Sequence, residues 1–174
     1  MQTSAWPVAI VILLVLVAIP ANAMTSESLD ISIRQDGKAD IRFAYHLDWL
    51  EYIAVYLRLV DPAAELKKAL ESNFGKPVTV ISVNSNSVHL SVDSFAQVSS
   101  SNGTMTARTP GLSFAAGEKI LKTYWFAPLV TADLSPSVTT IRFPDGYVET
   151  FPDRIEIPPL VHTWKAGEGS QVPG

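Results

Sequence analysis

The chain has 174 residues, 47% of them apolar and 17% charged, so it is too short for several large domains and too apolar for a disordered protein. It contains no cysteine, which excludes disulfides, thiol chemistry and cysteine-ligated zinc. The formal net charge of -4 is spread along the chain, so neither nucleic acid nor an anionic membrane surface is an expected partner.

The first 23 residues are almost entirely apolar and carry no charged side chain. Twelve consecutive apolar residues (8–19) precede Pro20-Ala21-Asn22-Ala23, which places small residues at positions -3 and -1 of a signal-peptidase site. As a helix this run would span about 18 Å, well short of the roughly 30 Å apolar core of a bilayer. We therefore predict a signal peptide over residues 1–23 and a secreted or cell-surface protein. The alternative is an uncleaved membrane anchor, because the lead has no Lys or Arg.

Two half-buried strands are predicted where the mature chain begins. Apolar and polar residues alternate over residues 29–33 and again over residues 39–47. A three-residue loop ending at Gly37 keeps the apolar side chains of both strands on one face, whereas a two-residue turn would oppose apolar and charged residues. The sequence therefore predicts a left-handed Gly37 and the pairs Ile33 with Ala39, Ile31 with Ile41, and Leu29 with Phe43.

Segment 49–60 is unusually apolar, with Glu51 and Arg58 as its only charged residues. Asp48 and Glu51 have the spacing of a capping box and favour a helix, although the segment also alternates as a strand would. This helix is expected either to be packed against the sheet or to expose an aromatic stripe to a partner. In the second case the residues expected to bind the partner are Trp49, Tyr52, Tyr56 and Leu59.

A second helix is predicted from Asp61-Pro62 to the stop at residues 73–75, with Leu70 facing inward and Lys67 paired with Glu71. Strands follow over residues 78–92, then a polar loop over residues 99–104 and a short helix near residues 118–125. Residues 143–147 are expected to form a turn that pairs Phe143 with Tyr147.

These elements predict a single α+β domain over residues 24–164, followed by a flexible tail over residues 165–174. The expected architecture is an antiparallel β-sheet of six to nine short strands and hairpins, with two or three helices packed on one face.

Known catalytic motifs are not found in the sequence. His46 and His89 fall on the polar faces of predicted strands, so with Asp48 and Asp93 they are candidate ligands for a zinc ion with an open position. The sequon Asn102-Gly103-Thr104 makes Asn102 a candidate glycosylation site. No role is predicted for His162, and the four carboxylates at positions 145, 149, 153 and 156 are expected to be scattered over alternate strand faces.

Four short motifs lie along residues 31–163. They are Asp36-Gly37-Lys38-Ala39-Asp40, Asp61-Pro62-Ala63-Ala64-Glu65-Leu66, Tyr124-Trp125-Phe126-Ala127-Pro128 and Phe143-Pro144-Asp145-Gly146-Tyr147. With them the chain resembles a group of small secreted or surface-exposed archaeal proteins without an assigned activity. The resemblance implies a compact domain outside the cytoplasm and brings no catalytic residue with it.

We expect a non-enzymatic module at the cell surface or outside the cell that binds a protein partner or assembles with itself. No cofactor is expected, and a membrane is an expected partner only if residues 1–23 are retained as an anchor. Two alternatives stay open. One is a secreted metal-assisted hydrolase that uses His46 and His89, and the other is the ectodomain of a membrane-anchored protein.

Overall fold

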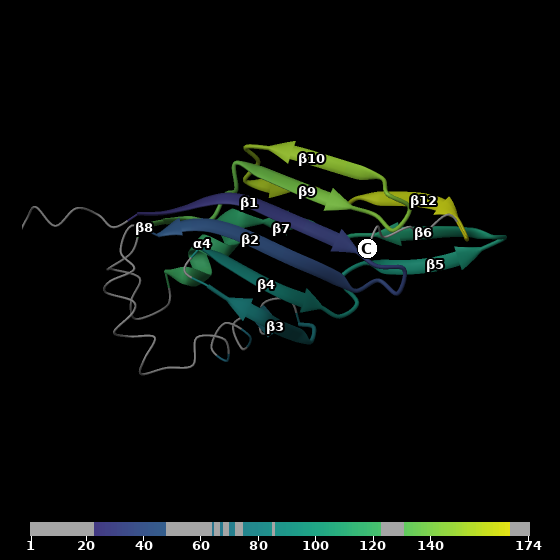
Figure 1. Ribbon diagram of the computed structural model, residues 1–174. Helices are drawn as coiled ribbons and strands as arrows, with labels where there is room; N and C mark the ends of the chain where they lie inside the picture. The colour runs from purple at the N-terminus through teal and green to yellow at the C-terminus, as the bar shows by residue number, and fades with distance from the viewer. Residues whose placement is uncertain are drawn as a thin grey trace, which may run out of the picture.

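The computed structural model describes residues 23–47, 64, 67, 70–71, 75–84, 86–122 and 131–167, and in these residues strands predominate (Figure 1). The largest sheet has seven strands: β1 (Ala23–Ile33), β2 (Ala39–Leu47), β3 (Val78–Val83), β4 (Ser87–Val92), β8 (Thr131–Asp133), β9 (Val138–Arg142) and β10 (Val148–Pro152). A three-stranded sheet contains β5 (Gln97–Ser101), β6 (Thr104–Arg108) and β12 (Val161–Lys165). A two-stranded sheet joins β7 (Leu112–Ser113) to β11 (Glu156–Ile157), and helix α4 (Phe114–Leu121) follows β7 directly.

Strand β1 lies in the middle of the seven-stranded sheet. Six of the strands follow the order β10-β9-β1-β2-β4-β3, and the short β8 also pairs with β1. Strand β1 pairs antiparallel with β2 on one side, and on the other side it runs parallel to β8 and then to β9. The sheet is therefore mixed. Its two parallel pairings join β1 to residues more than one hundred positions later in the chain.

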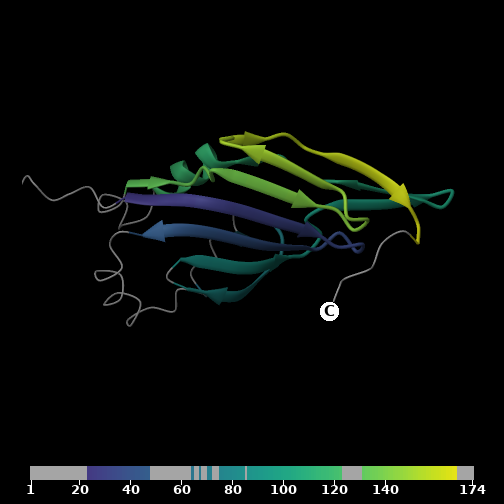
Figure 2. The same cartoon turned by 45° about the horizontal axis from the view of Figure 1, so that its top comes forward.

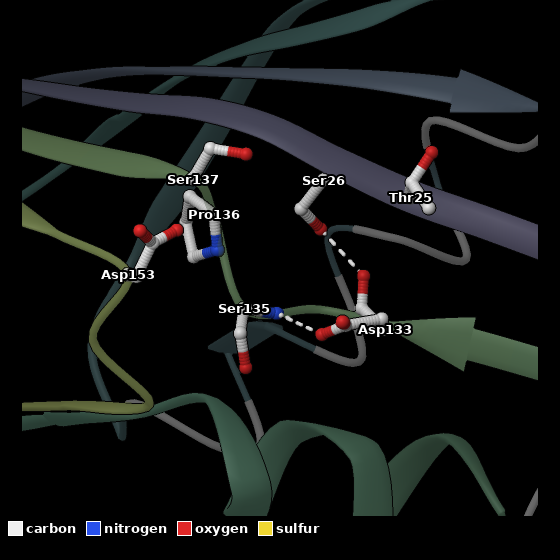
Figure 3. A pocket seen from close by; sticks show the side chains of 7 residues that line it. All are labelled: Thr25, Ser26, Asp133, Ser135, Pro136, Ser137 and Asp153. Carbon is white, nitrogen blue, oxygen red and sulfur yellow. Dashed lines mark hydrogen bonds between the residues drawn. The ribbon is translucent and has the colours of Figure 1, made fainter.

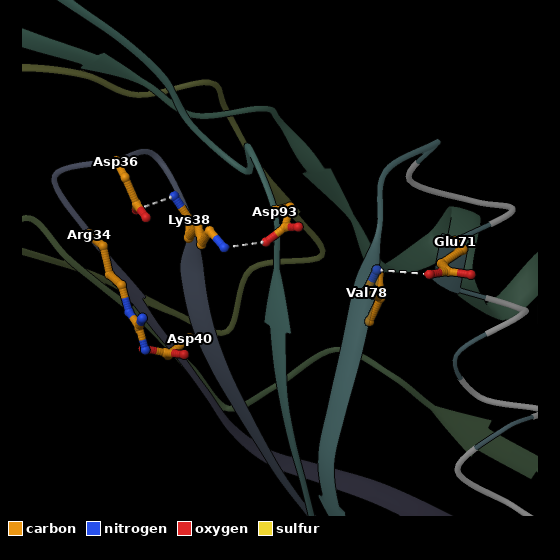
Figure 4. Close-up of polar contacts among 7 residues, drawn as sticks. All are labelled: Arg34, Asp36, Lys38, Asp40, Glu71, Val78 and Asp93. Carbon is orange, nitrogen blue, oxygen red and sulfur yellow. Dashed lines mark hydrogen bonds and ion pairs between the residues drawn. The ribbon is translucent and has the colours of Figure 1, made fainter.

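The β1–β2 hairpin has the predicted register. Ile33 pairs with Ala39, and the pairs of residues 31 with 41 and 29 with 43 are confirmed as well. Gly37 has φ of +82° as predicted, and its carbonyl oxygen accepts a hydrogen bond of 2.9 Å from the amide of Ala96. Polar contacts fix the rest of the loop, since the Asp36 carboxylate accepts from the Lys38 amide (3.0 Å) and Arg34 pairs with Asp40 (Figure 4).

One hydrophobic core is shared by all three sheets. In β1 the odd-numbered residues 29, 31 and 33 are buried in it, whereas Asp30 and Ser32 lie on the opposite, more polar face of the sheet. Fully burying a Leu, Ile or Phe side chain stabilises a fold by about 1.5–3 kcal/mol, so the shared core holds the sheets together. The smaller sheets and their connections contribute Phe95, Ala96, Ala107, Ile157, Leu160 and Trp164.

The β5–β6 hairpin projects beyond the ends of β1 and β2 (Figures 1 and 2). Its base is anchored in the core through the buried Ala107, and β12 pairs along its other side. Residues 99–104 were expected to form a polar loop, and that prediction is wrong. The two strands run almost to the tip, where Asn102 and Gly103 form a two-residue turn.

The predicted α+β class is also wrong, because the described residues are mostly β. We expected two or three helices on one face of a single antiparallel sheet, but the inner face of the large sheet packs against strands of two smaller sheets. The physical reason is that short strands such as β7, β8 and β11 contain too few residues to show an alternating pattern.

The predicted helices have different outcomes. Ala64, Lys67, Leu70 and Glu71 have helical backbone; Leu70 packs against the core and Lys67 lies 3.9 Å from Glu71, as expected for the helix predicted from Asp61-Pro62 to the stop at residues 73–75. Helix α4 begins at Phe114, four residues before the predicted start, and segment 49–60 lies outside the described residues. In the described part of the chain, no helix has the length and apolarity needed to cross a membrane.

Candidate functional site

A side-chain contact between the large and the three-stranded sheet joins His162 to Asp145. Nε2 of His162 lies 2.8 Å from Oδ2 of Asp145, and each side chain is less than one fifth exposed. His162 is the second residue of β12, and Asp145 lies in the turn between β9 and β10. The contact therefore attaches this turn to the neighbouring sheet.

The local sequence of the turn explains how Asp145 is positioned. The Phe143 amide donates a hydrogen bond to the Tyr147 carbonyl (2.8 Å), and the Gly146 amide donates to the Phe143 carbonyl (3.0 Å). Gly146 has φ of +90°, a conformation that other residues adopt at a cost. Oδ1 of Asp145 accepts from the Tyr147 amide (3.2 Å), which leaves Oδ2 directed to His162.

Three aromatic rings surround the imidazole of His162. The Tyr147 ring is stacked on it, with centroids 4.3 Å apart and planes 10° apart. The Phe143 and Trp164 rings lie 4.7 Å and 6.0 Å away. Phe143 and Trp164 are buried, whereas Tyr147 is 46% exposed. We call these five residues the His162 cluster: Phe143, Asp145, Tyr147, His162 and Trp164.

The environment of Asp145 favours its ionised form. Burial raises the pKa of Asp145, but the hydrogen bond with His162, the amide of Tyr147 and the nearby imidazole charge together bring the pKa below its ordinary value of 3.8. A carboxylate can only accept hydrogen bonds, so at neutral pH Nε2 of His162 carries the shared hydrogen. Asp145 thereby sets the tautomer and the orientation of the imidazole.

Exposed apolar side chains gather along the same stretch of chain. Four of the five large hydrophobic side chains that are exposed in the described residues come from positions 147–161: Tyr147, Val148, Ile155 and Val161. Val148 follows Tyr147 and Val161 precedes His162 in the chain, but side chains alternate along β10 and β12, so the two valines lie on the faces opposite Phe151 and His162. The fifth, Ile81, lies on β3 at the opposite edge of the large sheet.

The predicted metal ligands do not come together. His89 of β4 lies opposite Arg42 of β2, and His46 is four residues farther along β2, or roughly 13 Å at about 3.3 Å per residue. Asp93 forms an ion pair of 3.1 Å with Lys38, which lies just before the other end of β2 (Figure 4). Asp48 lies outside the described residues, within which no group of three His, Asp or Glu side chains could hold a metal ion.

The predicted partner-binding residues cannot be placed on the fold, because Trp49, Tyr52, Tyr56 and Leu59 lie outside the described residues. Asn102 is placed, at the exposed tip of the β5–β6 hairpin.

A shallow polar hollow of about 290 Å³ lies where β1, β8 and the end of β10 meet (Figure 3). The Ser26 hydroxyl donates to the Asp133 carbonyl (2.7 Å), and the Ser135 amide donates to Oδ1 of Asp133 (2.9 Å). These groups stabilise the connection between β8 and β9, and we assign no ligand to the hollow. Its lining residues are Thr25, Ser26, Asp133, Ser135, Pro136, Ser137 and Asp153.

The His162 cluster was missed from the sequence, although part of its signal was present. His162 and Trp164 are two residues apart and therefore share a face of one strand, and the turn that pairs Phe143 with Tyr147 was predicted and is confirmed. The local pattern could not predict that β12 lies beside this turn, because β12 belongs to another sheet.

No protein-family model, no curated protein and no solved structure matches the chain. The resemblance to small surface-exposed archaeal proteins stays a prediction. Function is therefore inferred from the His162 cluster and the exposure of its Tyr147 ring.

Proposed function

We propose that this protein is an exported, non-enzymatic module that binds another protein through a surface centred on Tyr147. The observation that carries the proposal is that Tyr147 is stacked on His162, lies beside the buried Phe143 ring and remains nearly half exposed. Aromatic side chains surrounded by apolar neighbours contribute a large share of the binding energy at protein interfaces.

Preorganisation supports this role for Tyr147. A free side chain loses conformational freedom when it binds, at a cost of about 0.5–1.5 kcal/mol, whereas a ring already held by stacking loses less. The His162 ring is itself oriented by Asp145, so the Tyr147 ring rests on a fixed support. The proposed contact surface is therefore centred on the Tyr147 ring.

Single cysteines provide a direct test, because the natural chain has none. Val148→Cys and Val161→Cys place an exposed thiol one residue from Tyr147 and from His162, and Ile81→Cys is the matched control at a residue of similar exposure on another edge. Each variant is labelled with a benzophenone maleimide, mixed with the surface fraction of the source cells, and irradiated.

We expect one discrete cross-linked product from positions 148 and 161, which mass spectrometry identifies as a partner or a second copy of the chain. Adding Tyr147→Ala to Val148→Cys should remove the product, while circular dichroism shows a folded domain. Equal cross-linking from position 81, or none from positions 148 and 161, would contradict the proposed surface.

A further inference from the structure

The tip of the β5–β6 hairpin has a defined backbone geometry. Ser101 pairs with Thr104, and Asn102 and Gly103 between them have φ of +50° and +74°. A two-residue loop with two positive φ values is a type I′ turn, in which Asn followed by Gly is the preferred pair. The chain thus presents Asn102 at the first position of an ordered turn.

The tip also has free space around it. Residues 101–104 are all exposed, and a Cβ atom added at Gly103 would have no neighbouring atom within 4 Å. The hairpin, with β12 beside it, projects beyond the large sheet in both views (Figures 1 and 2). A bulky group attached at the tip would therefore displace no part of the described structure.

Contacts behind the tip keep it in place. The Gly103 carbonyl accepts a hydrogen bond of 2.8 Å from the Ala166 amide, and Thr104 pairs with Ser101 on one side and Lys165 on the other. These backbone contacts leave the side chains of Asn102 and Thr104 exposed.

We propose that Asn102 is the attachment site of an N-linked glycan. Asn102-Gly103-Thr104 has the Asn-x-Thr pattern of an acceptor site, and the structure displays it on an exposed turn. The sugar donor is a polyprenyl-phosphate-linked saccharide. The amide nitrogen of Asn102 forms a bond to the anomeric carbon, the bond from that carbon to the phosphate oxygen breaks, and one amide proton leaves to water.

The position of the glycan suggests what it does for the domain. Strand β5 is at the edge of its sheet, and within the described residues no strand pairs with it on the side away from β6. An unpaired edge strand is a template for pairing with another chain. A hydrated glycan at the tip next to this edge would hinder such pairing.

The inference rests on the proposed export of the chain, and mass spectrometry of the protein purified from its source cells tests both. The cell fraction that holds the chain reports export, and the N-terminal peptide reports cleavage: it begins at Met24 after cleavage and at Met1 without it. The peptide that contains Asn102 should carry added mass in the wild type and in Thr104→Ser, which preserves the acceptor pattern. Thr104→Val retains a β-branched residue but lacks the hydroxyl, and it should lose the added mass.

The outcomes separate the two proposals. A chain found outside the cytoplasmic fraction with unmodified Asn102 overturns the glycan while export stands, and an unmodified chain found in the cytoplasmic fraction overturns both. Added mass that persists in Thr104→Val would also overturn the assignment to Asn102. The shielding role predicts that Thr104→Val associates at lower concentration than Thr104→Ser in light scattering, and equal association would overturn that role.

Discussion

His162 and Asp145 form a hydrogen bond of 2.8 Å that joins β12 of the three-stranded sheet to the β9–β10 turn of the large sheet. The two residues are 17 positions apart in the chain. Because the Tyr147 ring is stacked on His162, the same contact supports both the packing of the sheets and the proposed binding surface.

Removing the charge of Asp145 should reduce stability in a pH-dependent way. The pKa of Asp145 is lowered in the folded state, so around and below pH 3.8 the unfolded chain binds more protons and stability rises with pH. The free energy of unfolding of Asp145→Asn should be about 1 kcal/mol lower than that of wild type at neutral pH. This difference should shrink as the pH falls through the folded-state pKa of Asp145. Urea unfolding from pH 2 to 7 measures both quantities.

A double-mutant cycle checks that this effect depends on His162. His162→Phe retains an aromatic ring but removes the hydrogen bond. If the losses caused by Asp145→Asn and His162→Phe simply add in the double variant, the two residues are not coupled and the assignment is wrong.

Replacing Gly37 should destabilise the fold strongly. Its φ is +82°, and a Cβ atom there would clash with the Ala96 carbonyl oxygen, so Gly37→Ala combines backbone strain with a steric clash. We expect Gly37→Ala to lower the free energy of unfolding, measured by chemical denaturation, by more than about 2 kcal/mol. Gly146→Ala is the matched control, because φ is +90° but no atom lies within 4 Å, and it should cost about 1 kcal/mol. Equal losses would show that the contact with Ala96 is not important.

Two buried threonines should respond in opposite directions to the same substitution. Thr139 is fully buried in β9 and its hydroxyl has no hydrogen-bond partner among the described residues, so Thr139→Val should stabilise the protein by about 1 kcal/mol. The hydroxyl of buried Thr109 accepts a hydrogen bond of 2.9 Å from the Leu160 amide. Thr109→Val should therefore cost about 1–3 kcal/mol. Thermal unfolding of both variants tests the contrast, which fails if Thr139→Val is also destabilising.

Tyr45 should make the fold sensitive to alkaline pH. Its hydroxyl donates to the Asn84 carbonyl (2.6 Å), and burial raises the pKa of Tyr45 above its ordinary value of 10.0. Because the unfolded chain loses this proton more readily, stability should be intact below pH 10 and fall as the pH rises through the folded-state pKa. Tyr45→Phe should remove this part of the alkaline loss. An unchanged pH profile in the variant would contradict the assignment.

Some features of the fold could be predicted because they depend on neighbours in the sequence. Alternating apolar residues and the position of Gly37 are sufficient to define the β1–β2 register, and the five-residue turn that pairs Phe143 with Tyr147 is equally local. The β5–β6 hairpin also had a local signal, the dipeptide Asn102-Gly103. It was missed because residues 99–101 are three serines, which show no apolar alternation.

Other features depend on contacts between distant parts of the chain. Apolar residues in β1 indicate a buried face, but they do not reveal that β9 is a neighbour or that strands rather than helices cover that face. The same limit applies to the His162 cluster, whose residues come from two sheets. The predicted zinc site failed because its two histidines were assigned to neighbouring strands without a known register.

The central place of β1 has a consequence for the order of folding. A ribosome or an export channel delivers β1 first, but its parallel neighbour β9 is delivered more than one hundred residues later. Loop closure over such a separation is slow, so the central pairing of the large sheet must wait until most of the chain has emerged. For a protein exported as an extended chain, this delay would keep the chain unfolded until it has passed through the membrane.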